Sequence, residues 1–272
     1  MSILRRSLRA LAIVPIAVAV VAAQSLPTSQ PKILQITREQ IKVGHEAAHL
    51  VTESGWPTAY ASVKSPDAYI ALASMTGTSE VWFISPWESQ TARAKSMDRD
   101  GSNAVLSATL DRLWAADAAH LDGSNQIEAV AVPELSHGAY PDLNHARFWE
   151  ITTFRVKPGH EARFAETAKI YGTLVDRAAP GASWRVYMVS EGMPGPTYLI
   201  FSTVQAFGEF DKGMASDEAI GKAATPAEMA ILSKFSLESV VNTVSNRYRL
   251  DPKMSYVSAE TKAMDPAFWN KK

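Results

Sequence analysis

The sequence has no cysteine among its 272 residues. This absence excludes disulfide bonds, thiol catalysis, zinc–thiolate sites and iron–sulfur clusters. The chain also lacks an excess of charge: its formal net charge is −1, so we expect no basic surface for a nucleic acid. The G-x-S-x-G, Walker and G-x-G-x-x-G motifs are missing as well, which leaves no standard signal for a serine nucleophile or a bound nucleotide.

One long apolar run is present, at the N-terminus. Arg5, Arg6 and Arg9 precede an apolar core that ends in the small residues Val21-Ala22-Ala23. This pattern predicts a signal peptide over residues 1–23, and hence a bacterial protein exported to the periplasm or beyond, with no transmembrane span in the mature form. The alternative is an uncleaved N-terminal membrane anchor.

The chain contains one segment twice. Residues 36–47 read I-T-R-E-Q-I-K-V-G-H-E-A and residues 151–162 read I-T-T-F-R-V-K-P-G-H-E-A, so seven of twelve positions are identical at an offset of 115. An internal repeat of this length predicts two similar structural units.

Apolar periodicity predicts the same order of elements in both units. In the second unit we expect strand 148–156, helix 161–178, strands 183–190 and 197–204, helix 226–241 and strand 246–251. In the first unit we expect strand 33–41, helix 45–64, strands 67–75 and 80–85, a helical region 88–121 and strand 126–132. Each unit is therefore β-α-β-β-α-β, the ferredoxin-like arrangement, whose bare sheet face the other unit can cover.

The predicted fold class is α+β, with two tandem ferredoxin-like repeats in a pseudo-dimeric α+β barrel. The expected boundaries are a signal peptide 1–23, a linker 24–32, repeat one 33–137, a connector 138–147, repeat two 148–256 and a C-terminal tail 257–272. The connector carries Gly, Pro, Asp and Asn without apolar periodicity, as turns do.

The run F-W-E-I-T-T-F-R-V-K-P-G-H-E-A-R-F resembles the first strand and turn of the dimeric α+β barrel superfamily. It is most similar to the NIPSNAP-like and antibiotic-biosynthesis-monooxygenase-like branches, and the likeness covers both halves in element order. The resemblance implies the fold more than a function. It implies a range of activities, because the superfamily includes cofactor-free monooxygenases, haem-binding enzymes, isomerases and stress-response proteins.

The first copy of the repeat continues into an H-E-x-x-H string, His45-Glu46-Ala47-Ala48-His49, which on a helix can bind zinc. Glu53 follows one turn later and could act as a third ligand. The second copy has the same His-Glu pair but Phe164 in place of the second histidine. This comparison favours a shared turn and helix start, with a glycine that permits an unusual backbone conformation and a glutamate in the first turn. Zinc through His45, His49 and Glu53 is kept as a remote alternative.

The two copies differ one turn further along the helix. Where the second has Phe164 and Ala168 on its apolar face, the first has His49 and Glu53. In one interpretation these two residues line a pocket with Trp56 and Tyr60 as walls, His49 acting as acid or base and Glu53 orienting it. In the other, Pro57 kinks the helix and both residues reach solvent.

We therefore predict an exported, non-catalytic small-molecule-binding or structural module, with a small apolar ligand as its possible partner. The alternative is a small-molecule enzyme, cofactor-free and monooxygenase-like or haem-linked, that uses His49 and Glu53. No cofactor is predicted, although haem and zinc stay open, and so does the oligomeric state. A zinc hydrolase is the third reading.

Overall fold

The computed structural model describes residues 24–270, and the signal peptide predicted over residues 1–23 lies outside this range. Eight strands close into a barrel in the order β1-β3-β2-β8-β5-β7-β6-β4, with every neighbouring pair antiparallel. The strands are β1 (Ile33–Ile41), β2 (Tyr69–Ser74), β3 (Glu80–Trp87), β4 (Leu121–Ala131), β5 (Phe148–Val156), β6 (Arg185–Glu191), β7 (Thr197–Val204) and β8 (Val240–Tyr256). The α+β class and the barrel predicted from the sequence are confirmed.

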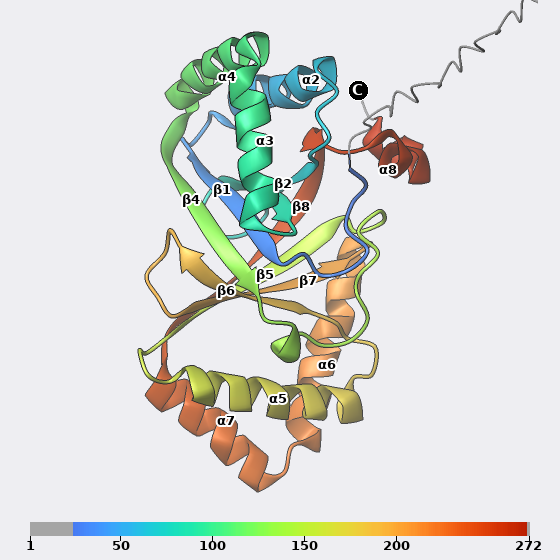
Figure 1. Ribbon diagram of the computed structural model, residues 1–272. Helices are drawn as coiled ribbons and strands as arrows, with labels where there is room; N and C mark the ends of the chain where they lie inside the picture. Colours follow the sequence, from blue (N-terminus) through green and yellow to red (C-terminus); the bar gives the residue numbers. More distant parts are fainter. Residues whose placement is uncertain (1–23, 271–272) are drawn as a thin grey trace, which may run out of the picture.

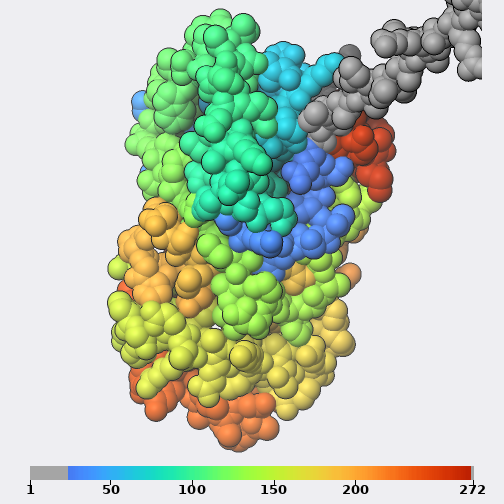
Figure 2. All heavy atoms as spheres, in the orientation of Figure 1, coloured from blue at the N-terminus to red at the C-terminus, as the bar shows by residue number. Residues whose placement is uncertain are grey.

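The helices form a layer at each side of the barrel (Figure 1). The first half contributes α1 (Glu46–Glu53), α2 (Gly55–Ser62), α3 (Gln90–Ser102) and α4 (Ala104–Asp117). The second half contributes α5 (Glu161–Ala178), α6 (Phe210–Ala223) and α7 (Pro226–Ser239). Figure 2 shows the green and cyan helices of the first half at one end of the molecule and the yellow and orange ones of the second half at the other.

Both halves pair their strands in the same order, β4-β1-β3-β2 in the first and β8-β5-β7-β6 in the second. They join where β2 meets β8 and where β4 meets β6. Strand β8 extends far beyond the predicted 246–251, because it pairs with β5 from Val240 to Arg249 and with β2 from Tyr248 to Tyr256. The first part of β8 has a polar sequence, but hydrogen bonds to a partner strand hold it in an extended conformation.

The inward-facing side chains of the strands form the main core, which runs through both halves. Ile36, Leu72 and Leu199 are fully buried there. One end of the barrel is polar: the buried Glu80 accepts hydrogen bonds from Trp82 Nε1 at 2.9 Å and from the Tyr248 hydroxyl at 2.7 Å, and pairs with Arg38. The opposite end is apolar.

The helix predicted over 45–64 is two helices, separated at Ser54. Pro57 lies in the first turn of α2, where its missing N–H costs least, so the chain restarts a helix there instead of kinking one. The helical region predicted over 88–121 likewise divides at Asn103, whose side chain caps α4 by accepting from the Leu106 N–H. In the second half, α6 precedes α7 and was not predicted.

The segments predicted as linker, connector and tail all pack on the apolar end of the barrel. Leu26, Leu143 and Ala146 are buried members of the main core. The tail forms α8 (Ala259–Met264) and α9 (Pro266–Trp269), and Trp269 is buried in the same core. Within residues 24–270, no helix combines the length and the apolar character needed to cross a membrane.

Candidate functional site

His49 and Glu53 face the sheet, one helical turn apart on α1. Both are buried, with 1% and 4% of their surface exposed. Of the two interpretations left open by the sequence, the structure therefore places both side chains away from solvent. The four-residue spacing on α1 aims them at the same patch of the sheet.

Two further acids complete a compact group that we call the acid–histidine cluster: Glu39, His49, Glu53 and Asp117. Glu39 projects from β1 and its carboxylate lies 3.1 Å from His49 Nε2, while Asp117, at the end of α4, lies 3.7 Å from the same nitrogen. All four residues are buried, and each offers one ligand atom within 4.8 Å of the others.

The cluster is short of positive charge. Three carboxyl groups and a single imidazole share a site from which water is excluded, and unpaired buried charge is costly. Burial, and next the neighbouring Glu39 and Asp117, raise the pKa of Glu53 to about 9. A proton on Glu53 is one way to reduce the excess charge, and a bound cation is another.

Asp117 is only half satisfied. One of its carboxylate oxygens accepts a hydrogen bond from the hydroxyl of Thr52. The other oxygen, Oδ2, is buried and has no hydrogen-bond partner among the described residues. Because buried acceptors are normally paired, an orphaned oxygen beside a histidine and two other carboxyl groups points to a ligand.

Aromatic side chains enclose the cluster. Phe83 lies beside His49, with 6.4 Å between ring centroids, and Tyr69 packs edge-on against Phe83. The two residues predicted as pocket walls, Trp56 and Tyr60, lie on α2 with their ring centroids 6.5 Å apart. The indole of Trp56 lies near Glu53 and acts to lower its pKa, but burial outweighs this effect. The indole N–H has no hydrogen-bond partner within the described chain. Two cavities occur elsewhere in the described part of the chain, and neither is lined by His49, Glu53, Trp56 or Tyr60.

The corresponding place in the second half is apolar. At the offset of 115, Glu39 matches Phe154, His49 matches Phe164 and Glu53 matches Ala168. Phe164 packs against Phe154, and Phe235 of α7 reaches the same spot, with ring centroids 5.9 and 6.0 Å from that of Phe164. The fold therefore does not need polar groups at this position.

The duplicated K-x-G-H motif is structural in both halves. Gly44 and Gly159 have φ of +86° and +84°, the left-handed region that favours glycine. Lys42 donates to the carbonyl of Ala119 and Lys157 to that of Glu238, which ties each turn to the helix end before the last strand.

The histidine of this motif does not join the cluster. His45 Nδ1 bonds His120 Nδ1 at 3.0 Å, just as His160 bonds the Ser239 hydroxyl at 2.9 Å. Glu46 is exposed in the first turn of α1, where backbone N–H groups lower its pKa. The structure thus brings His49 and Glu53 together with Glu39 and Asp117, and leaves His45 apart.

Sequence reasoning missed Glu39 and Asp117. A signal for Glu39 exists, since the same offset pairs it with Phe154. Asp117 has no such signal, because the copies differ in length before the last strand: Ile36 pairs with Ile127 but Ile151 with Asn246.

The ligand set suits a divalent metal. Ligand atoms at about 2.1 Å from one ion lie about 3 Å apart when adjacent and about 4.2 Å apart when opposite, so four atoms within 4.8 Å of one another must draw together to share an ion. Haem does not fit here: His49 is almost fully enclosed and its Nε2 is already engaged by Glu39, whereas an axial ligand needs an open face for the porphyrin.

No protein-family model matches the chain, and no curated protein matches it. Solved structures of similar shape do exist. A provisionally named monooxygenase from Fusobacterium nucleatum has 11% identity over 81% of this chain and 93% of its own, with a TM-score of 0.53. An anthrone oxidase-like protein has 10% identity over 83% and 94%, also at 0.53. A provisionally named chlorite dismutase reaches 0.47. The first two likenesses show the dimeric α+β-barrel fold, and at this identity they show the fold alone.

Proposed function

We propose that this protein is a metal-binding α+β barrel, and that Glu39, His49, Glu53 and Asp117 hold a divalent first-row transition metal. The observation that carries the proposal is the difference between the halves: three of the four buried ionisable groups, Glu39, His49 and Glu53, stand where the second half has two phenylalanines and an alanine. Burying ionisable groups that the fold does not require lowers stability. Metal binding would explain their presence, because a bound cation offsets this cost.

One nitrogen and three carboxylate ligands favour manganese(II) or iron(II) over softer ions. Carboxylates suit hard cations, and the imidazole moves the preference from magnesium or calcium toward transition metals. When bound, such an ion supplies Lewis acidity or one-electron chemistry. The protein's own contribution is to fix the ligands from three elements, β1, α1 and α4, and to keep the site dry.

The test is a metal analysis of the purified protein, followed by titration of manganese(II) and iron(II) into metal-free protein by calorimetry. We expect one ion per chain, and a gain in stability of about 2.7 kcal/mol at a hundredfold excess over Kd. Binding must displace the proton of Glu53, so affinity is expected to rise with pH up to about 9.

The variants His49→Gln and Glu53→Gln should weaken binding by at least tenfold. The control is His137→Gln, a histidine that stacks on Trp184 of the second half and also pairs with an acid, Asp176, at 3.2 Å. A chain that takes up no ion, or one whose Glu53→Gln variant binds as tightly as the wild type, would contradict the proposal.

An enzymatic role is the second candidate. The ring of Tyr69 lines the cavity at the apolar end of the barrel, and its buried hydroxyl has no partner among the described residues. Burial, and next the nearby Glu53, raise the pKa of Tyr69 well above its usual value. Tyr69 therefore links a cavity to the cluster. Oxidation of a small molecule, the activity in the names of two structures of similar shape, is the reaction class to test once the metal is known.

We also infer that the two halves arose by duplication, which the shared strand order and the repeated turn support. A NIPSNAP-like ancestry and export through residues 1–23 remain proposals. N-terminal sequencing of the native protein tests export: a mature chain that begins near Gln24 supports it, and an intact N-terminus supports an anchor.

A further inference from the structure

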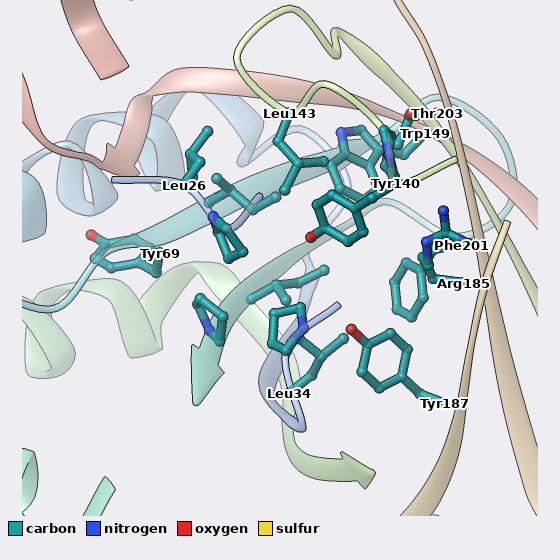
Figure 3. A pocket seen from close by; sticks show the side chains of 16 residues that line it. Leu26, Leu34, Tyr69, Tyr140, Leu143, Trp149, Arg185, Tyr187, Phe201 and Thr203 are labelled. Atoms are coloured by element: carbon teal, nitrogen blue, oxygen red, sulfur yellow. The ribbon is translucent and has the colours of Figure 1, made fainter. Parts of the chain in front are cut away.

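The apolar end of the barrel contains a cavity that is separate from the acid–histidine cluster. It has a volume of about 60 Å³ and lies between the strand ends and the two segments that cover them, residues 24–32 and the connector (Figure 3). Its walls are almost entirely leucine, isoleucine, proline and aromatic side chains. A space of this size admits a ligand of only a few non-hydrogen atoms.

A buried cation lines this cavity. Arg185, at the start of β6, is 8% exposed and has no carboxylate within ion-pair distance in the described part of the chain. Its guanidinium donates to the carbonyls of His137, Trp184 and Gly138 at 2.7 to 2.9 Å. These three bonds leave the Nε hydrogen and one Nη2 hydrogen free. Burial lowers the pKa of Arg185, the expected effect on a cation without a counter-ion.

Other polar groups at the cavity can donate hydrogen bonds. The hydroxyls of Tyr140 and Tyr187 both point into it (Figure 3). Burial raises the pKa of Tyr140 to about 12, so its phenol keeps its proton. Trp149 is 7% exposed, and its buried indole N–H has no partner within the described residues. A cation, an unsatisfied indole donor and hydroxyl groups in apolar surroundings are complementary to an anion.

The fold does not demand the arginine. In the first half the matching register position of β2 is Ile70, which pairs with Ile84 as Arg185 pairs with Phe201. Ile70 lines the same cavity from the opposite half. The cavity therefore has one apolar and one cationic side.

We propose that this cavity binds a short-chain carboxylate of two or three carbons, with its charged end at Arg185 and Tyr140 and its alkyl group toward Ile70 and Leu34. The carboxylate would accept the free guanidinium hydrogens and the Tyr140 hydroxyl, and would neutralise the buried cation. The alkyl group would gain from the apolar walls, which an inorganic anion cannot use. None of the four proposed metal ligands lines this cavity.

The test is saturation-transfer NMR of acetate and propionate with the full chain in EDTA at pH 7, which removes metal coordination as a source of binding. We expect both to bind, and acetamide, which has the shape of acetate without its charge, to bind at least tenfold more weakly. Arg185→Gln should weaken acetate binding at least tenfold and Tyr140→Phe about threefold. The control Arg249→Gln removes an exposed arginine of β8 and should change nothing.

Arg185 also holds the connector, so Arg185→Gln could act by loosening it. The acetate-to-acetamide ratio in the wild type does not depend on that variant. Equal binding of acetate and acetamide, no binding of either, or displacement of acetate by an equal concentration of nitrate would overturn the proposal.

Discussion

Glu53 is the residue whose chemistry depends most on its surroundings. It lies on a short amphipathic helix, buried against two other carboxyl groups, with a pKa raised to about 9. In the unfolded chain its pKa returns near 4.5. The native state therefore holds a proton that the unfolded state releases between these two values, and this difference makes stability depend on pH.

We predict that metal-free wild-type protein loses stability as pH rises from 5 to 8. A raised carboxyl pKa contributes most below the unfolded value, and the contribution falls as pH rises through the folded one, by at most about 1.4 kcal/mol per pH unit. Glu53→Gln should remove this part of the slope. Urea denaturation at pH 5, 6.5 and 8 measures it; parallel slopes for the two proteins would show that Glu53 ionises as usual.

At the scale of elements, α1 and α5 begin with the same turn and then diverge. The turn was predictable, because a glycine in a repeated K-x-G-H segment implies a backbone need and both glycines have positive φ. The apolar stripe of the second copy suggested an inward direction for His49 and Glu53, but Pro57 left exposure to solvent as the alternative, and only the structure decided between the two. The contact of Glu39 with His49 could not be predicted from strand alternation. Alternation indicates which face of the sheet a residue lies on, but not which side chain it contacts.

The first and last residues of β8 could not be predicted from the sequence either. Its first part, through Asn242, Thr243 and Ser245, is polar on both faces, so periodicity gives no strand signal. This segment is a strand because it pairs with β5, and the rest of β8 pairs with β2. Such contacts between distant segments cannot be predicted from the local sequence.

The duplicated turn gives a matched pair of variants. Gly44→Ala and Gly159→Ala should each cost about 1 kcal/mol, because an added Cβ meets no neighbouring atom and only the left-handed backbone penalises it. Gly101→Ala is the control, since this glycine in α3 also has open space around it and no positive φ, and alanine should stabilise the helix by up to about 1 kcal/mol. Urea midpoints give all three values; a cost at only one of the two turns would mean that they are not equivalent.

At the scale of the whole molecule, one chain closes the barrel and seals its apolar end with segments from three distant places. The N-terminal segment, the connector and the last two helices contribute Leu26, Leu143 and Trp269 to one core. Arg147 of the connector end pairs with Asp265 between the last two helices. In Figure 1 the label α8 marks these helices beside the start of the described chain.

We predict that the C-terminal helices belong to the cooperative unit. Trp269→Ala should cost about 3 to 5 kcal/mol, as large core truncations do. Met264→Ala, on the same segment but 58% exposed, should change stability by less than about 0.5 kcal/mol. Chemical denaturation followed by circular dichroism distinguishes the two; a Trp269→Ala protein as stable as the wild type would mean that residues 257–270 are an appendage.

Because both halves belong to one chain, each half can carry different residues at corresponding positions. In a barrel made of two identical chains, any acid placed under the helices appears twice, and the assembly carries the cost of burying it twice. Here the second half keeps its phenylalanine core and can act as a stable scaffold, while the first accommodates Glu39, His49, Glu53 and Asp117. The polar site could then evolve in one half, while the apolar core of the other half maintained the stability of the whole barrel.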